Sequence, residues 1–152
     1  MILNVGKLKE YVGVTIERKN EKTVELSQPD SIKIMQQKFN SEIEKMKTFK
    51  SPVGPSDVVM HLRNENEKID DDTQQRFQSG VGMLLWLAKH SRPDISNAVR
   101  EVSKVMNGAM RAHYKYMLRI IKYVSDTKDK KLRLQPIDKD KEEKKAWEIH
   151  PH

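Results

Sequence analysis

Residues 71–106 read DDTQQRFQSGVGMLLWLAKHSRPDISNAVREVSKVM, a stretch from which much of the architecture can be predicted. Its apolar residues recur every three or four positions, which is the spacing of an amphipathic helix. Arg92-Pro93-Asp94 interrupts the spacing, because proline lacks a backbone donor and is tolerated in the first turn of a new helix. The stretch therefore predicts one helix over residues 73–90 and a second over residues 93–106.

A third helix is predicted farther along the chain. Asn107-Gly108 ends the second helix, and helical spacing resumes over residues 109–125. The stripe that this helix should bury consists of Met117, Leu118, Ile120, Ile121 and Val124. Three helices joined by short connectors predict a small antiparallel bundle.

Upstream of these helices the pattern changes to the alternation of strands. Residues 8–16 form an apolar run that Gly13 interrupts, and residues 23–26 alternate again. Together they predict a β-hairpin, with a bulge or a close contact at Gly13. A helix should then begin near Pro29, because proline suits the first helical turn.

The expected fold class is α+β: an N-terminal β-hairpin and helix, followed by a mainly α three-helix bundle. A long surface connector is expected between the two parts, since residues 48–66 carry proline and glycine with few periodic apolar residues. Four segments are predicted: the hairpin and helix in 1–47, the connector in 48–72, the bundle in 73–136, and a charged, poorly ordered tail in 137–152.

Composition limits the classes of function. Lysine and arginine number 29 against 22 acidic residues, and the resulting +7 charge attracts phosphate backbones or anionic membrane surfaces. The absence of cysteine excludes disulfides, thiolate metal sites and a cysteine nucleophile. No stretch approaches ~18 consecutive apolar residues. We therefore expect an intracellular protein, cytoplasmic or nuclear and not secreted, with no membrane partner.

One face of the predicted helix over residues 73–90 is unusual. Gln78, Gly82 and Trp86 share it, and Gly80 stands close by. Each glycine costs about 1 kcal/mol relative to alanine in a helix interior, so something should approach the backbone closely. A nucleic-acid minor groove would fit this face, with glycine admitting the sugars and tryptophan packing on them. Close helix packing, with Trp86 in the core, is the interpretation that the spacing alone favours.

Positive charge concentrates in the helical part. Twelve basic residues stand against four acidic ones between Lys89 and Arg133. Several recur at three or four residues and form basic ridges opposite the apolar stripes; they are Arg100, Lys104, Arg111, Lys115, Arg119 and Lys122. Such ridges suit a phosphate-binding surface. A solvated helix face with no ligand is an equally good interpretation at this point.

Catalytic and metal chemistry have little support in the sequence. Asp70, Asp71 and Asp72 directly precede a predicted helix, where carboxylates favour the positive end of its dipole, so capping is favoured over metal binding. The five histidines show no ligand spacing beyond His150 with His152. No glycine-rich phosphate loop or Ser-His-Asp arrangement is visible. We expect no catalytic residue and no metal site in this chain.

Several short sequence motifs occur in a characteristic order between Val5 and Pro136. They are Leu8 to Ile16, Leu26-Ser27-Gln28, Ser51-Pro52, Val81-Gly82-Met83-Leu84-Leu85-Trp86-Leu87-Ala88, Arg92-Pro93-Asp94-Ile95 with Ala98-Val99, and Arg119 to Val124. In this order they resemble the region after the catalytic motif in copia-type (Ty1/copia) retrotransposon reverse transcriptases. The block from Val81 to Ala88 is the most specific part of the resemblance.

The resemblance implies a role for each part. The hairpin with Tyr11, Val12 and Gly13 would be the primer grip at the end of the palm, and the bundle would be the thumb. The expected partner is a template-primer duplex, either RNA–DNA or DNA. Gln78, Gly82 and Trp86 fall where a thumb helix of related retroviral enzymes tracks the minor groove. The resemblance therefore favours nucleic-acid contact over core packing for this face.

The resemblance also implies a division of labour within a polyprotein. The fingers, most of the palm and the aspartates that bind magnesium are expected upstream of Met1. A ribonuclease H domain is expected after a segment resembling Ala146-Trp147-Glu148-Ile149. We therefore expect a fragment of an RNA-directed DNA polymerase that binds duplex, is inactive alone, needs no cofactor itself and has these domains as partners. A protein-interaction module and an inert remnant of a decayed transposon are the alternatives.

Overall fold

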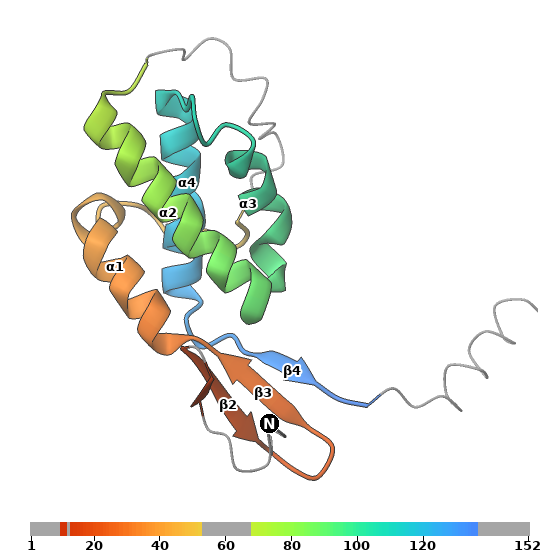
Figure 1. Ribbon diagram of the computed structural model, residues 1–152. Helices are drawn as coiled ribbons and strands as arrows, with labels where there is room; N and C mark the ends of the chain where they lie inside the picture. The colour runs from red at the N-terminus through yellow and green to blue at the C-terminus, as the bar shows by residue number, and fades with distance from the viewer. Residues whose placement is uncertain (1–9, 12, 53–67, 137–152) are drawn as a thin grey trace, which may run out of the picture.

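A computed structural model describes residues 10–11, 13–52 and 68–136 and has an α+β fold. The helices pack together, and an antiparallel sheet lies at one end of them (Figure 1). The expected fold class is confirmed. The elements are β1 (Glu10–Tyr11), β2 (Val14–Arg18), β3 (Val24–Ser27), α1 (Pro29–Ile43), α2 (Asp71–His90), η3 (Pro93–Ile95), α3 (Ser96–Ser103), α4 (Arg111–Asp126) and β4 (Leu132–Leu134).

The sheet has the strand order β1-β2-β3-β4. The single strand expected over residues 8–16 is wrong, because β1 and β2 pair with each other as separate antiparallel strands. Gly13 lies in the turn between them with φ +80°, a conformation that glycine adopts without steric cost. β4 was not predicted, and it adds to β3 with Leu132 opposite Leu26. Val12 and the tail expected at 137–152 lie outside the described residues.

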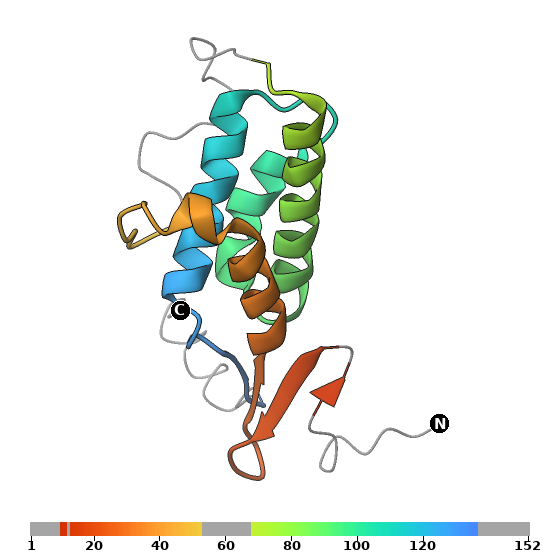
Figure 2. The same cartoon turned by 90° about the vertical axis from the view of Figure 1, so that its left-hand side faces the viewer.

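Helix α1 belongs to the same core as the later helices. Its Met35 and Phe39 are fully buried, and it packs against α2 and α4. Figure 2 shows α1 lying across these two helices. Phe39 and Phe77 each contribute roughly 1.5–3 kcal/mol through removal from water. The helical part is therefore a packing of α1, α2, α3 and α4 around one hydrophobic core, where the sequence led us to expect a bundle of three helices.

The start of α2 follows the expected capping chemistry. The Asp70 carboxylate accepts a hydrogen bond from the backbone N–H of Thr73 at 2.7 Å. A hydrogen bond from the Thr73 side chain, followed by this one from the Thr73 backbone, holds the pKa of Asp70 below its usual value. An ionised carboxylate at this position satisfies a free N–H and complements the helix dipole. The capping interpretation of Asp70 is confirmed.

The end of α2 is held by a buried arginine. The side chain of Arg92 is almost wholly buried and donates two hydrogen bonds to Asp94, from Nε at 3.0 Å and from Nη2 at 2.9 Å. It also donates to the carbonyl and the hydroxyl of Thr127, at 3.1 and 2.8 Å. The network joins the α2–η3 corner to the end of α4. Arg92 is one of the twelve basic residues counted between Lys89 and Arg133, but its buried side chain does not contribute to a basic surface.

The start of α1 and the end of α2 are joined at this corner by a hydrogen bond. Ser91 Oγ donates to the buried Gln28 Oε1 at 2.6 Å, which connects the start of α1 to the end of α2. Asp94 also accepts a hydrogen bond from the Tyr123 hydroxyl at 3.2 Å. Burial raises the pKa of the Asp94 carboxyl, but the hydrogen bonds and charge of Arg92 outweigh burial and hold the pKa below its usual value. The corner therefore favours an ionised Asp94.

Candidate nucleic-acid interface

The exposed side of α2 carries large apolar side chains. Leu85 is 41% exposed and Trp86 is 37% exposed, and Gly82 and Lys89 on the same side are also exposed. These four residues form what we call the outer face of α2. The core interpretation of Trp86 is wrong, because residues such as Leu84 and Leu87 on the opposite side of the helix fill the core.

The two glycines of α2 have different surroundings. A Cβ atom added at Gly80 would lie 2.5 Å from Met117 Sδ and 3.0 Å from Phe39 Cζ. Close packing of α2 against α1 and α4 therefore explains Gly80. A Cβ atom added at Gly82 would meet no atom within 4 Å among the described residues. Gly82 leaves a notch of bare backbone on the outer face, and no helix of the described part fills it.

Gln78 lies at the flank of this face. Its side chain is half-buried, and its Nε2 donates to the carbonyl of Met106 at 3.2 Å. Gln74, one turn earlier, accepts a hydrogen bond from the backbone N–H of Ala109 at 3.2 Å. These bonds tie α2 to the connection between α3 and α4. The amide of Gln78 is therefore engaged within the fold, whereas Gly82 and Trp86 present open surface.

A shallow apolar groove runs between α1 and α2. It has a volume of about 320 Å³ and is lined by Ser31, Ile34, Gly82, Met83 and Trp86. Ile34 is 57% exposed, and the sequence analysis did not identify it. The buried residues of α1 are Ile32, Met35, Phe39 and Ile43, and their helical spacing leaves Ile34 outside the buried side. Ile34 extends the outer face of α2 onto α1.

Polar neighbours orient and flank the outer face. The imidazole of His90 lies against Trp86, with 4.0 Å between ring centroids, and its Nδ1 lies 2.9 Å from the Trp86 carbonyl oxygen. Lys38 Nζ on α1 donates to the hydroxyl of Ser79 at 2.6 Å. Lys38 thus places a cation one turn before Gly82, and Lys89 places another beyond it. The sequence analysis did not identify Lys38, because its proximity to α2 depends on the packing of α1.

The predicted basic ridges lie on other sides of the molecule. Arg100 and Lys104 are exposed on or just after α3, and Arg111 and Lys115 are exposed on α4. Lys104 is ion-paired with Glu101 at 2.9 Å. The buried side of α2 packs against α3 and α4, so the exposed sides of these two helices face away from the outer face of α2 (Figure 1). One flat surface cannot contact the outer face and the α4 ridge together.

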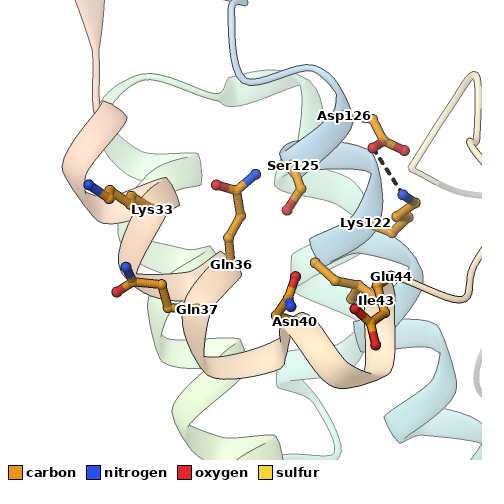
Figure 3. Close-up of a pocket in the computed structure, with 9 residues that line it drawn as sticks. All are labelled: Lys33, Gln36, Gln37, Asn40, Ile43, Glu44, Lys122, Ser125 and Asp126. Atoms are coloured by element: carbon orange, nitrogen blue, oxygen red, sulfur yellow. Dashed lines mark hydrogen bonds and ion pairs between the residues drawn. The ribbon is translucent and has the colours of Figure 1, made fainter.

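A polar groove separates α1 from α4 on the side opposite the apolar groove. Its volume is about 540 Å³, and Lys33, Glu44, Lys122 and Asp126 are among its lining residues. Figure 3 shows the side chain of Lys122 directed at Asp126, with which it forms an ion pair of 3.1 Å. The two lysines and two acids balance in charge. This groove is therefore a poor site for a phosphate.

The remaining predicted residues are placed as follows. The guanidinium carbon of Arg119 lies 4.3 Å from the ring centroid of Phe49, in the segment after α1. Tyr11 lies in β1, and a Cβ atom at Gly13 would lie 3.9 Å from Ser31 Oγ at the start of α1.

In the described residues, no group of three or more histidines and acids is placed to hold a metal ion. Among the described helices, none combines the length and the apolar composition of a membrane-spanning segment.

Comparison with known proteins bears on the origin of the chain. No protein-family model matches the sequence, and no solved structure matches it. The chain is similar to a transposon protein. It is 28% identical over 125 residues to a putative transposon Ty5-1 protein of Saccharomyces cerevisiae, a match that covers 82% of this chain and 39% of the relative. The similarity supports a retrotransposon origin for a chain that spans about two fifths of this relative's length.

Proposed function

We propose that this chain is the thumb, with the adjoining end of the palm, of a copia-type retrotransposon reverse transcriptase. In this role it grips the template-primer duplex, either RNA–DNA or DNA, and the primer-grip-like hairpin lies beside the thumb. Polymerisation and its magnesium ions belong to the aspartate-bearing part of the palm. The transposon relative supports this origin. The fingers, the rest of the palm and a ribonuclease H domain are the proposed partners in the polyprotein.

The bare backbone notch at Gly82 beside the exposed ring of Trp86 is the observation that carries the proposal. The minor groove of a duplex exposes sugar edges, and a helix can approach them closely only where it lacks a side chain. The ring of Trp86 and the side chain of Ile34 offer apolar surface for the sugars. Lys38 and Lys89 stand before and after the notch and can reach phosphates on either side of it.

Substitution of Gly82 tests the proposal with little risk to folding. Alanine at this position meets no neighbour in the described residues, so the Gly82→Ala chain should fold at least as well as the parent. Its affinity for an RNA–DNA hybrid, measured by fluorescence anisotropy, should nevertheless fall several-fold because the notch is filled. Gly108→Ala is the matched control, since Gly108 is also exposed with no neighbour around its Cβ position. Parental affinity in Gly82→Ala would overturn the proposal.

Trp86→Ala gives a second readout on the same face. We expect loss of hybrid binding with unchanged helical circular dichroism, because the ring is partly exposed and lies outside the core cluster. Binding of the parent chain should weaken steeply as salt rises to about 0.2 M, because phosphate contacts release counterions. Loss of helical signal in Trp86→Ala would instead assign the ring a structural role.

The apolar groove favours a second candidate, a docking site for a partner helix. Ile34, Met83 and Trp86 could receive apolar residues spaced one turn apart on such a helix. Under this alternative the chain would ignore nucleic acid at every salt concentration, and Lys38→Gln with Lys89→Gln would have no effect on binding. Under the duplex proposal the same double variant should weaken hybrid binding and reduce its dependence on salt.

A further inference from the structure

The segment after α1 places lysines around one aromatic ring. Lys47 and Lys50 are exposed, and Phe49 between them is half-buried. Arg119 lies over the Phe49 ring at 4.3 Å from its centroid, and Lys47 Nζ lies 5.7 Å from the same centroid. Lys115, one turn before Arg119 on α4, is also exposed. We call these five residues the Phe49 surface.

The lysines of this surface differ from others in their lack of acidic partners. Lys104 and Lys122 are each ion-paired with a carboxylate of their own helical segment. Among the described residues, no ion pair involves Lys47, Lys50 or Lys115. Their charges are therefore available to a ligand, and they gather where a chain segment and a helix that are distant in sequence come together.

The Phe49 surface faces a different direction from the outer face of α2. Figure 2 shows the segment after α1 beside α4, with α2 on the other side of α1. Met117 of α4 packs at Gly80 of α2, and Lys115, two positions before Met117, lies on the opposite side of α4. A straight duplex lying along the outer face of α2 would therefore not reach Lys115 or Phe49. The exposed cations of this side of α4 therefore lie beyond the reach of a duplex bound on the outer face of α2.

We infer that the Phe49 surface binds single-stranded nucleic acid. A single strand presents both unstacked bases and phosphates, whereas the bases of a duplex are stacked inside it. The Phe49 ring and the planar guanidinium of Arg119 provide a platform on which a base stacks. Lys47, Lys50 and Lys115 surround the platform with charges for the flanking phosphates. This combination of cations and one aromatic group fits a nucleic-acid strand better than a surface of lysines alone would.

The inference extends the chain's ligands beyond the proposed duplex grip and is independent of it. A labelled oligouridylate of about 12 nucleotides is the probe, since single-strand sites commonly span 4–16 nucleotides. Lys47→Gln combined with Lys115→Gln should weaken its binding about tenfold at low salt. The log–log slope of affinity against salt should fall by about 1.4, since each contact with a single strand contributes about 0.7.

The control is Lys33→Gln combined with Lys104→Gln, which removes the same charge from other exposed sites. This variant should bind the oligouridylate nearly as well as the parent chain. Equal weakening in both double variants would show attraction by net charge alone and would overturn the inference. Phe49→Leu keeps an apolar side chain but removes the ring, so it should weaken binding without altering the salt slope. Unchanged binding in Phe49→Leu would overturn the stacking platform.

Competition separates this site from the duplex grip. Excess RNA–DNA hybrid should leave the oligouridylate bound to the parent chain, and Gly82→Ala should not affect oligouridylate binding. Displacement of the oligouridylate by the hybrid would overturn the inference of a second surface. Failure of hybrid binding together with intact oligouridylate binding would overturn the duplex grip and support the Phe49 surface.

Discussion

The packed side and the open side of α2 use the same residue type for opposite reasons. Gly80 lies where Phe39 and Met117 leave no room for a Cβ atom, so glycine allows the core to close. Gly82, two residues later, has empty space above it in the described structure and faces outward beside Trp86. The first glycine is explained by folding, whereas no contact within the described fold explains the second. A costly residue without a structural reason is where a ligand should be sought.

The largest expected loss of stability tests the buried hydrogen-bond network of Arg92, at the C-terminal end of α2. Arg92→Ala should lower the free energy of unfolding by about 3–5 kcal/mol, because it removes the four hydrogen bonds of a buried guanidinium and opens a space beside Thr127. Urea unfolding followed by tryptophan fluorescence measures it. Arg100→Ala, at an exposed site, should stay within about 0.5 kcal/mol of the parent. Similar losses in both variants would contradict the buried network.

The next effect tests the close approach at Gly80. Gly80→Ala forces Met117 and the rigid Phe39 ring to shift, and overpacking of this kind costs about 1–3 kcal/mol. The gain in helix propensity offsets about 1 kcal/mol of this cost. We expect a net loss of about 1 kcal/mol in the same urea titration. An increase in stability would mean that α2 does not pack as tightly on α1 and α4 as the structure indicates.

On the outer face of α2, replacing glycine by alanine should increase stability instead of lowering it. Gly82→Ala should raise the free energy of unfolding by up to about 1 kcal/mol, because alanine has the higher helix propensity and meets no neighbour. Thermal unfolding followed by circular dichroism measures it alongside Gly80→Ala. Destabilisation by Gly82→Ala would show that the outer face is covered, and it would remove the contrast between the two sides.

The smallest expected effect is the contribution of Asp94 to the loss of stability at acid pH. Because the pKa of Asp94 is lowered in the folded chain, its contribution to stability is present above the usual aspartate pKa of about 3.9 and is lost as pH falls through the lower folded value. Asp94→Asn should therefore lose less stability than the parent chain between neutral pH and acid. Urea midpoints at pH values above and below this range measure the difference. Parallel curves would contradict an ionised Asp94 at the corner of α2.

Much of the architecture follows from local patterns. Pro29, Asp70 and Pro93 each mark a helix start in the sequence, and α1, α2 and η3 begin at or next to them. The exposure of Gly82 and Trp86 also agrees with the proposed ligand face. By contrast, β4 consists of three residues whose strand character depends on pairing with β3, so its short alternation was too weak a signal. Ile34 and Lys38 lie next to the outer face of α2 only because α1 packs beside α2.

Local patterns in the sequence specify where the helices begin, which side of each is apolar, and that cations follow the opposite sides. These properties repeat every three or four residues, so neighbouring positions are enough to specify them. Tertiary packing sets the direction in which each helix turns its exposed side. It buried Arg92, brought Arg119 to Phe49, and directed the cations of α4 away from Trp86. Such relations depend on packing between distant segments, and no local spacing encodes them.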